Sequence, residues 1–170
     1  MLNIYPILLN FPGKLAIISR PRGNEILEES IEFLKSIEVN LVVSALTKEE
    51  EFELGLNKEK EVCEKYRIDF LQFRIEDRGV PANVSLFQSF CKDLALKIQE
   101  GKSIGIHCRA GIGRSSLIAA SVMIHLGFTS SNALSIISES RNLKVPDTIE
   151  QEKWVGEYYK SAIGKVSDMG

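Results

Sequence analysis

Short apolar runs alternate with segments of helical periodicity along most of the chain. The runs are rich in aliphatic and β-branched residues and are bounded by polar or glycine-containing segments, which predicts strands. They are residues 13–19, 40–46, 67–73 and 102–108. Because helical segments separate them, we expect a mainly parallel sheet with helices on both faces. Ligands of such sheets bind beyond the carboxyl ends of the strands.

The remaining segments carry apolar residues at the spacing of one helix face. The predicted helices are residues 24–38, 83–100, 114–126, 129–141 and 146–164. The helix at 114–126 is apolar on nearly all sides, which indicates a central helix packed by several neighbours. Two pairs, Thr47 with Glu50 and Asp147 with Glu150, have capping-box spacing. We expect the first pair to begin a solvated helix and the second to begin the last helix.

Composition and charge are those of an ordinary globular domain. The chain has 170 residues, 44% hydrophobic and 26% charged, without repeats or a linker, so we expect one domain over residues 1–170. The net charge of -2, with both signs interspersed, leaves no basic field for nucleic acid or an anionic membrane. No apolar run approaches about 18 residues, and the N-terminus lacks the features of a secretory signal. We expect a cytoplasmic monomer that binds neither nucleic acid nor a membrane.

The cysteines and histidines restrict the chemistry. Cys63, Cys91 and Cys108 are an odd number without the paired spacing of zinc ligands, which argues against both a disulfide framework and a zinc site. His107 and His125 complete no cluster of metal ligands with nearby carboxylates. Cys63 and Cys91 are interpreted as small core residues. We therefore expect chemistry carried by side chains, with no metal and no cofactor.

The stretch HCRAGIGRSS, residues 107–116, joins the last predicted strand to the central helix. In such a turn, successive backbone N–H groups can curl around an anion, and the helix N-terminus adds partial positive charge. Gly111 and Gly113 allow positive φ and a close approach of the backbone to a ligand. Arg114 offers a planar fork for two phosphoryl oxygens, and these positive charges favour the thiolate form of Cys108. The turn is therefore a candidate phosphate nest with a nucleophile at its base.

Phosphoryl transfer to sulfur also needs an acid that protonates the leaving oxygen. Asp77 and Glu76 follow the strand predicted at 67–73, at the same edge of the sheet, and we choose Asp77. Asp77 would then act as the base for the water that hydrolyses the thiophosphate. Arg20 and Arg22 follow the first predicted strand, whose carboxyl end is expected at the same edge of the sheet. They are candidates for recruiting a phosphorylated or acidic substrate, the alternative being two solvated turn arginines.

This stretch resembles the Cys-x5-Arg-Ser/Thr signature of the protein tyrosine phosphatase superfamily. Its HC and AGIGRS parts look most like the dual-specificity branch of the kinase-associated type. NLVVSALTKEEEFELGL, RIDFLQFRIEDRGVP and the distance from Asp77 to Cys108 extend the resemblance over most of residues 13–160. The resemblance implies the cysteine-phosphatase fold, an α/β domain with a central, mainly parallel sheet of four to five strands flanked by helices.

The resemblance also implies a role for each residue that matches the family motif. The catalytic roles fall on Cys108 as nucleophile, Arg114 as phosphate clamp, Asp77 as general acid and Ser115 as hydrogen-bond donor to the leaving thiolate. His107 would support the thiolate through the hydrogen-bond network of the loop. Gln151 is similar in position to the glutamine that orients the hydrolytic water in some branches. The phosphate-binding loop would consist of Arg109, Ala110, Gly111, Ile112 and Gly113.

The function implied is that of a phosphoprotein phosphatase acting on phosphotyrosine, with phosphoserine and phosphothreonine tolerated. No long phosphotyrosine-recognition loop precedes residues 13–19, so the pocket is expected to be shallow. The loop carries one basic residue, Arg109, in place of the paired lysines that look like 3-phosphoinositide readers, which disfavours lipids. Two alternatives stay open: a phosphatase for an inositide, nucleotide or RNA 5′ end, and a non-catalytic phospho-binding module. A sulfurtransferase is disfavoured because Asp77 would have no task.

Overall fold

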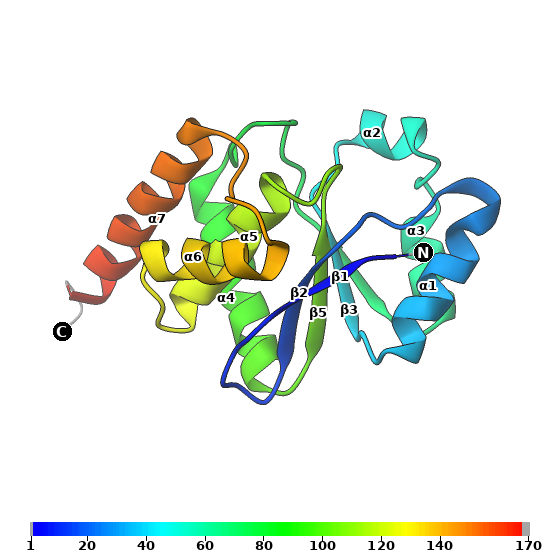
Figure 1. Cartoon of the computed structure of the whole chain (residues 1–170), viewed down its shortest axis with the longest axis horizontal. Coiled ribbons are helices and arrows are strands. Elements are labelled where there is room, and N and C mark those ends of the chain that lie inside the picture. The colour runs from blue at the N-terminus through cyan, green and yellow to red at the C-terminus, as the bar shows by residue number, and fades with distance from the viewer. Residues whose placement is uncertain (1, 168–170) are drawn as a thin grey trace.

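The computed structural model describes residues 2–167, and within them a single sheet has helices on both faces (Figure 1). Its five strands lie in the order β1-β2-β5-β3-β4. They are β1 (Ile4–Ile7), β2 (Lys14–Ile18), β3 (Leu41–Ser44), β4 (Asp69–Gln72) and β5 (Ser103–His107). β2, β5, β3 and β4 are parallel, and β1 pairs antiparallel with β2. The predicted α/β fold with a mainly parallel sheet is confirmed.

The strand β1 is absent from the sequence prediction. It is short and contains Pro6, a residue that strands tolerate at the edge of a sheet, where β1 lies. The pairing continues past its start, since the N–H of Ser19 donates to the carbonyl of Asn3 at 2.9 Å. In return, the N–H of Asn3 donates to Oγ of Ser19 at 2.9 Å. These bonds hold the N-terminal segment beside the carboxyl end of β2.

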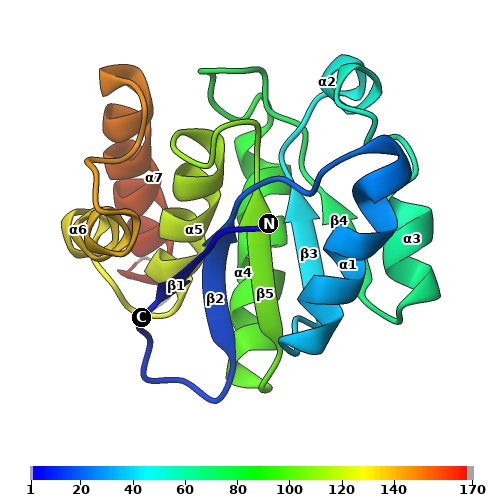
Figure 2. The ribbon, with the colours of Figure 1, turned by 45° about the vertical axis from the view of Figure 1, so that its right-hand side comes forward.

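The helices form a layer on each face of the sheet (Figures 1 and 2). The larger core lies under α4 (Val84–Gln99), α5 (Arg114–His125), α6 (Ser130–Arg141) and α7 (Ile149–Ser167). The smaller core lies under α1 (Leu27–Ser36), which a short 3-10 turn (Asn24–Ile26) precedes, and α3 (Glu59–Lys65). Residues 114–124 of α5 are all buried, as expected for a central helix. None of the described helices is long and apolar enough to cross a membrane.

The segments that follow β3, β4 and β5 stay side by side beyond the carboxyl ends of these strands. The N–H of Ala45 donates to the carbonyl of His107 at 3.0 Å, and the N–H of Ile75 donates to the carbonyl of Ala45 at 3.1 Å. The short helix α2 (Lys48–Glu53) stands above this edge (Figure 1). Three loops far apart in the sequence are thereby brought together where a parallel sheet binds its ligands.

The start of α2 confirms one part of the sequence prediction and corrects another. Oγ1 of Thr47 accepts from the N–H of Glu50 at 3.3 Å, and Oε2 of Glu50 accepts from the N–H of Thr47 at 2.9 Å, so the capping box is present. The expected solvation is wrong, because Glu50 and Glu51 are only 7% and 8% exposed. Both carboxylates are buried against arginines, Glu50 against Arg114 and Glu51 against Arg74.

The start of α7 differs from the sequence prediction by one residue. The N–H of Gln151 donates to Oγ1 of Thr148 at 3.0 Å, and the N–H of Thr148 donates to Oε1 of Gln151 at 3.2 Å. The capping pair is therefore Thr148 with Gln151, and the predicted pair of Asp147 with Glu150 is wrong. The carboxylate of Asp147 instead forms an ion pair with Arg78 at 3.2 Å.

Candidate active site

The turn between β5 and α5 surrounds the sulfur of Cys108 with polar groups. The N–H of Gly111 donates to Sγ of Cys108 at 3.3 Å, and a hydrogen bond of 3.3 Å joins this Sγ to Oγ of Ser115. Gly111 has a φ of 70°, in the left-handed region that glycine adopts without strain. Cys108 is 3% exposed and lies directly before the N-terminus of α5. This thiol therefore lies at the base of a turn whose N–H groups and helix dipole favour an anion.

Gly113, the second glycine of the loop, is closely packed. A Cβ at Gly113 would lie 2.9 Å from Oε1 of Gln151 and 3.0 Å from Cβ of Asp147. Gln151 is fully buried, and its Nε2 donates to the carbonyl of Gly79 at 2.9 Å. Gln151 thus lies between the loop and the turn that carries Asp77. Its side chain closes this side of the site and caps α7 at the same time.

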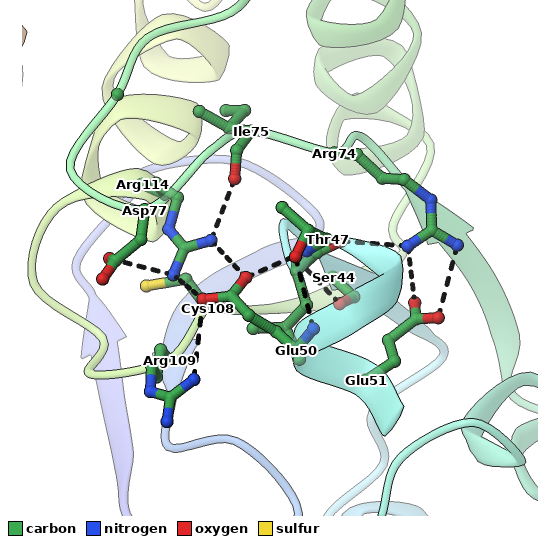
Figure 3. A network of polar contacts seen from close by, with 12 residues as sticks. Ser44, Thr47, Glu50, Glu51, Arg74, Ile75, Asp77, Cys108, Arg109 and Arg114 are labelled. Atoms are coloured by element: carbon green, nitrogen blue, oxygen red, sulfur yellow. Dashed lines mark hydrogen bonds and ion pairs between the residues drawn. The ribbon is translucent and has the colours of Figure 1, made fainter. Parts of the chain in front are cut away.

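Arg114 is the most highly connected side chain of the site (Figure 3). Its Nη1 and Nη2 donate to the two carboxylate oxygens of Glu50 at 2.7 and 2.9 Å. Nη1 also donates to the carbonyl of Ile75 at 2.9 Å, and Nη2 donates to Oδ1 of Asp77 at 3.1 Å. The arginine is 2% exposed, so its orientation is fixed by these contacts. The structure therefore brings Cys108, Arg114 and Asp77 together, as the sequence predicts.

The pair of Arg114 and Glu50 keeps both groups charged in spite of burial. Burial alone would lower the pKa of Arg114, but the hydrogen bonds from its guanidinium to Glu50 and the negative charge of a Cys108 thiolate raise it above its usual value. Burial alone would raise the pKa of Glu50, but the hydrogen bonds from Arg114 and Thr47 lower it below its usual value. The carboxylate thus compensates a buried cation at the site.

Glu50 is the main site residue that the sequence analysis misses. In the sequence, Glu50 is interpreted as the second residue of a capping box, and this role accounts for a glutamate there without any function in catalysis. The signal that could have identified it is position, because the capping box follows β3 directly, at the edge where the turn after β5 also lies. The capping bond fixes this carboxylate in the first turn of α2, facing Arg114 (Figure 3).

Asp77, rather than Glu76, faces the loop between β5 and α5. Its side chain is 61% exposed, and its contact with Nη2 of Arg114 is an ion pair at 3.1 Å. The neighbouring Arg78 has a φ of 61° and pairs with Asp147 at the start of α7. The turn that carries Asp77 is thereby attached to both α5 and α7. An exposed carboxyl at the rim of the site is accessible to a bound substrate.

His107 lies below the loop and contacts a carboxylate outside it. Its Nε2 is 2.6 Å from Oε1 of Glu59 on α3, and both side chains are almost completely buried. Its Nδ1 is 3.4 Å from the carbonyl of Cys108, a longer contact. Glu59 is a second residue missed from the sequence, because it lies in a short, highly charged segment typical of a solvated surface.

Arg20 and Arg109 connect the turn after β2 to the loop. Nη1 of Arg20 donates to the carbonyl of Arg109 at 2.6 Å. Nη1 of Arg109 donates to Oε2 of Glu53 at 3.3 Å and lies 3.9 Å from Oε1 of Glu50. Ala110 is exposed beside them, while Ile112 is half-buried against the larger core.

The other titratable residues that the sequence singles out lie away from this site. Cys63 and Cys91 are fully buried, and burial raises the pKa of each thiol well above its usual value. His125 is half-buried, with Nε2 at 2.5 Å from the hydroxyl oxygen of Tyr158, and burial lowers its pKa. Across residues 2–167, no group of three or more histidine, cysteine or acidic side chains is arranged to hold a metal ion.

Several solved structures share this fold. The kinase associated phosphatase, solved with its catalytic-site cysteine replaced by serine, superimposes with a TM-score of 0.86 at 19% identity, covering 94% of this chain and 95% of that one. Tk-PTP in its active form gives a TM-score of 0.74 at 21% identity, with 92% and 97% covered. PTPMT1, also solved with PI(5)P, gives a TM-score of 0.74 at 20% identity, with 98% and 99% covered.

The family itself is shown by a match to most of the chain. Residues 28–161 match the model of the catalytic domain of dual specificity phosphatases. This range includes β3, β4 and β5, the turn between β5 and α5, and the start of α7. The chain therefore belongs to the dual specificity phosphatase family.

Proposed function

We propose that this chain is a single-domain phosphoprotein phosphatase that hydrolyses phosphotyrosine, and also phosphoserine and phosphothreonine, through a phosphocysteine intermediate and without a metal ion. The observation that carries the proposal is the surroundings of Cys108. Its sulfur has a backbone N–H donor and a hydroxyl at 3.3 Å, at the N-terminus of a helix whose first residue is a charge-compensated arginine. These groups can bind the oxygens of a phosphoryl group next to the sulfur.

In the first step, the thiolate of Cys108 attacks phosphorus and the bond from phosphorus to the ester oxygen breaks. The phosphoryl group occupies the turn, where loop N–H groups and Arg114 bind its oxygens. Nη2 of Arg114 donates to Asp77 in the free protein, so the phosphate displaces Asp77 from this nitrogen. The displaced carboxylate of Asp77 takes up a proton from water, and this proton passes to the leaving oxygen as its bond to phosphorus breaks.

In the second step, water attacks the phosphocysteine. Asp77, now a carboxylate, accepts the proton of this water, and the bond from phosphorus to sulfur breaks. Ser115 donates a hydrogen bond to the departing thiolate from 3.3 Å. One hydrogen of Nε2 of Gln151 is bonded to Gly79, so the second can orient the water. Inorganic phosphate leaves, and the thiolate is regenerated.

Hydrolysis assays with a chelator present test the substrate class. Peptides with phosphotyrosine, phosphoserine or phosphothreonine are compared with a soluble inositol phosphate and a nucleoside 5′-monophosphate. We expect turnover of the peptides, because the exposed carboxyl of Asp77 can reach the leaving oxygen of a protein side chain. Turnover should be fastest for phosphotyrosine, whose phenolic oxygen is the least basic leaving group. Turnover restricted to the inositol phosphate or the nucleotide would contradict the phosphoprotein assignment. Binding of phosphopeptides without any turnover would identify a phospho-binding module instead.

The role of Asp77 is tested by the leaving group. Asp77→Asn removes the transferable proton and should lower kcat/KM, which reports formation of the phosphocysteine, by about 10²-fold or more on alkyl phosphates, where the leaving oxygen is strongly basic. The loss should be much smaller on p-nitrophenyl phosphate, whose leaving group departs without protonation. Glu76→Gln is the matched control, because Glu76 precedes Asp77 and makes no side-chain contact with Arg114 among the described residues. An equal, small loss on both substrates would exclude Asp77 as the acid.

A further inference from the structure

The turn that carries Asp77 is held by an anchor on either side of this residue. On the near side, the N–H of Ile75 donates to the carbonyl of Ala45 at 3.1 Å. The carbonyl of Ile75 accepts from Nη1 of Arg114 at 2.9 Å, and its side chain is 2% exposed. On the far side, Arg78 follows Asp77 directly, so a contact that fixes Arg78 also restricts Asp77.

The far anchor joins this turn to the start of α7 and the residues just before it. Nη1 of Arg78 lies 3.2 Å from Oδ2 of Asp147. The carbonyl of Gly79 accepts from Nε2 of Gln151 at 2.9 Å. Asp147 also borders the turn between β5 and α5, because a Cβ at Gly113 would lie 3.0 Å from the Cβ of Asp147. Asp147 therefore lies between the turn that carries the acid and the turn that is proposed to bind phosphate.

The backbone of Arg78 is in a conformation that needs support from its surroundings. Its φ is 61°, in the left-handed region that a residue with a side chain adopts only at a cost in conformational energy. The N–H of Gly79 donates to the carbonyl of Glu76 at 2.8 Å, which closes a tight turn. Such a conformation persists where neighbouring contacts hold it. Among the described residues, the ion pair with Asp147 is the only polar contact that the side chain of Arg78 supplies.

Asp77 depends on these two anchors once a phosphate is bound. Within residues 2–167, the only hydrogen bond of its side chain is the one from Nη2 of Arg114 (Figure 3). In the proposed first step the phosphate takes over this nitrogen, so Asp77 has lost the contact when it transfers its proton. Its side chain is 61% exposed, so packing does not fix it either. The position of the acid is then set by the main chain on both sides of it.

We propose that Asp147 is a positioning residue for the general acid and acts through its ion pair with Arg78. The inference rests on the proposed phosphatase function and adds a residue to its first step. Proton transfer requires the acid within hydrogen-bond reach of the leaving oxygen, so a small displacement of the turn slows this transfer. An exposed ion pair is weak, and Gln151 holds Gly79 without it. Loss of Asp147 should therefore cost less activity than loss of Asp77 itself.

The dependence of activity on the leaving group tests this proposal. Asp147→Asn and Arg78→Gln each remove the ion pair, and each should lower kcat/KM on alkyl phosphates about fivefold, the effect of one exposed ion pair. On p-nitrophenyl phosphate, whose leaving group needs no acid, kcat/KM should stay within about twofold of the native value. The double variant should show no further loss, because both substitutions remove the same contact. A general loss of folded protein would instead lower both activities equally.

The matched control is Glu150→Gln, because Glu150 lies in the first turn of α7, is exposed and forms no ion pair within residues 2–167. It should keep both values of kcat/KM. The proposal is overturned if Asp147→Asn leaves kcat/KM on alkyl phosphates unchanged or lowers it equally on both substrates. It is also overturned if the losses of Asp147→Asn and Arg78→Gln add up in the double variant. The proposed function is tested separately, by turnover of p-nitrophenyl phosphate in the native chain, which none of these outcomes removes.

Discussion

Cys108 and Cys91 are buried to nearly the same degree, at 3% and 0% exposure, but their surroundings differ in kind. Cys91 lies on α4 in the larger core, where burial raises the pKa of its thiol although Tyr158 forms a hydrogen bond with it. Cys63 lies in the smaller core, where burial and the charge of Glu59 also raise the pKa of its thiol. Cys108 instead has a backbone N–H, a hydroxyl, a helix N-terminus and Arg114 around it. Under the proposed function, nearby donors and charges, rather than burial, prepare a cysteine for nucleophilic attack.

The largest expected effect is on kcat, which should depend on Cys108 and not on Cys63 or Cys91. Cys108→Ser should lower kcat on p-nitrophenyl phosphate by on the order of 10⁴-fold or more, because a hydroxyl at this position is a far weaker nucleophile. Cys63→Ala and Cys91→Ala are the controls and should retain kcat within about twofold, while losing about 1 kcal/mol of unfolding free energy from the core. Activity retained by Cys108→Ser would show that Cys108 is not the nucleophile.

The next effect is on the rate at which each of the three cysteines is alkylated. At mildly acidic pH, iodoacetate should modify Cys108 about 100-fold faster than Cys63 or Cys91, since burial raises the pKa of the two core thiols and the turn attracts the anionic reagent. Inorganic phosphate should protect Cys108, and all three should react alike in denaturant. Peptide mass spectrometry measures the modified fraction at each position. Faster labelling of Cys63 or Cys91 than of Cys108 would contradict the assignment of Cys108 as the reactive thiol.

The smallest effect concerns the carboxylate that compensates Arg114. Glu50→Gln should lower the unfolding free energy near neutral pH by roughly 2–4 kcal/mol, because it leaves a buried guanidinium without its charge partner. The folded pKa of Glu50 lies below its usual value, so its carboxylate stabilises the fold fully above about pH 4.3. This contribution is lost as the pH falls through the lowered pKa.

The difference between the native chain and Glu50→Gln should therefore shrink on acidification below about pH 4. Urea unfolding of both proteins across this range measures the difference. Glu49→Gln is the control, because Glu49 lies in the same turn of α2 but is exposed and does not contact Arg114 among the described residues. A difference between native and Glu50→Gln that stays constant with pH would show that Glu50 does not act through its charge.

Much of the fold could be predicted because the spacing of apolar residues and the residues found at turns indicate the same strands and helices along the chain. The parallel strands and the central helix α5 are long enough, or apolar enough, to be unambiguous. β1 could not be predicted because its four residues include a proline, and only its position at the edge of the sheet makes that proline acceptable. α3 is a seven-residue helix in a highly charged segment, and its burial depends on the partners that the fold supplies.

The residues of the candidate site also fall into two groups, those that the sequence predicts and those that it misses. Cys108, Arg114 and Ser115 lie in one continuous motif, and Asp77 follows a predicted strand, so spacing and edge position were sufficient to propose them. Glu50, Glu59 and Arg141 come from three separate helices, and they reach the loop through side-chain contacts. No local pattern encodes such contacts, since each of these residues is typical of an ordinary helix surface.

The central claim is that Cys108, alone among the three cysteines, forms a covalent bond to phosphorus. The most direct measurement is rapid acid quenching of the enzyme with p-nitrophenyl phosphate, using both the native chain and Asp77→Asn, in which hydrolysis of the intermediate is slowed. We predict phosphate on the Cys108 peptide, accumulating further in Asp77→Asn, and none on the peptides of Cys63 and Cys91. Release of p-nitrophenol with no phosphate on Cys108 in either protein would contradict the account.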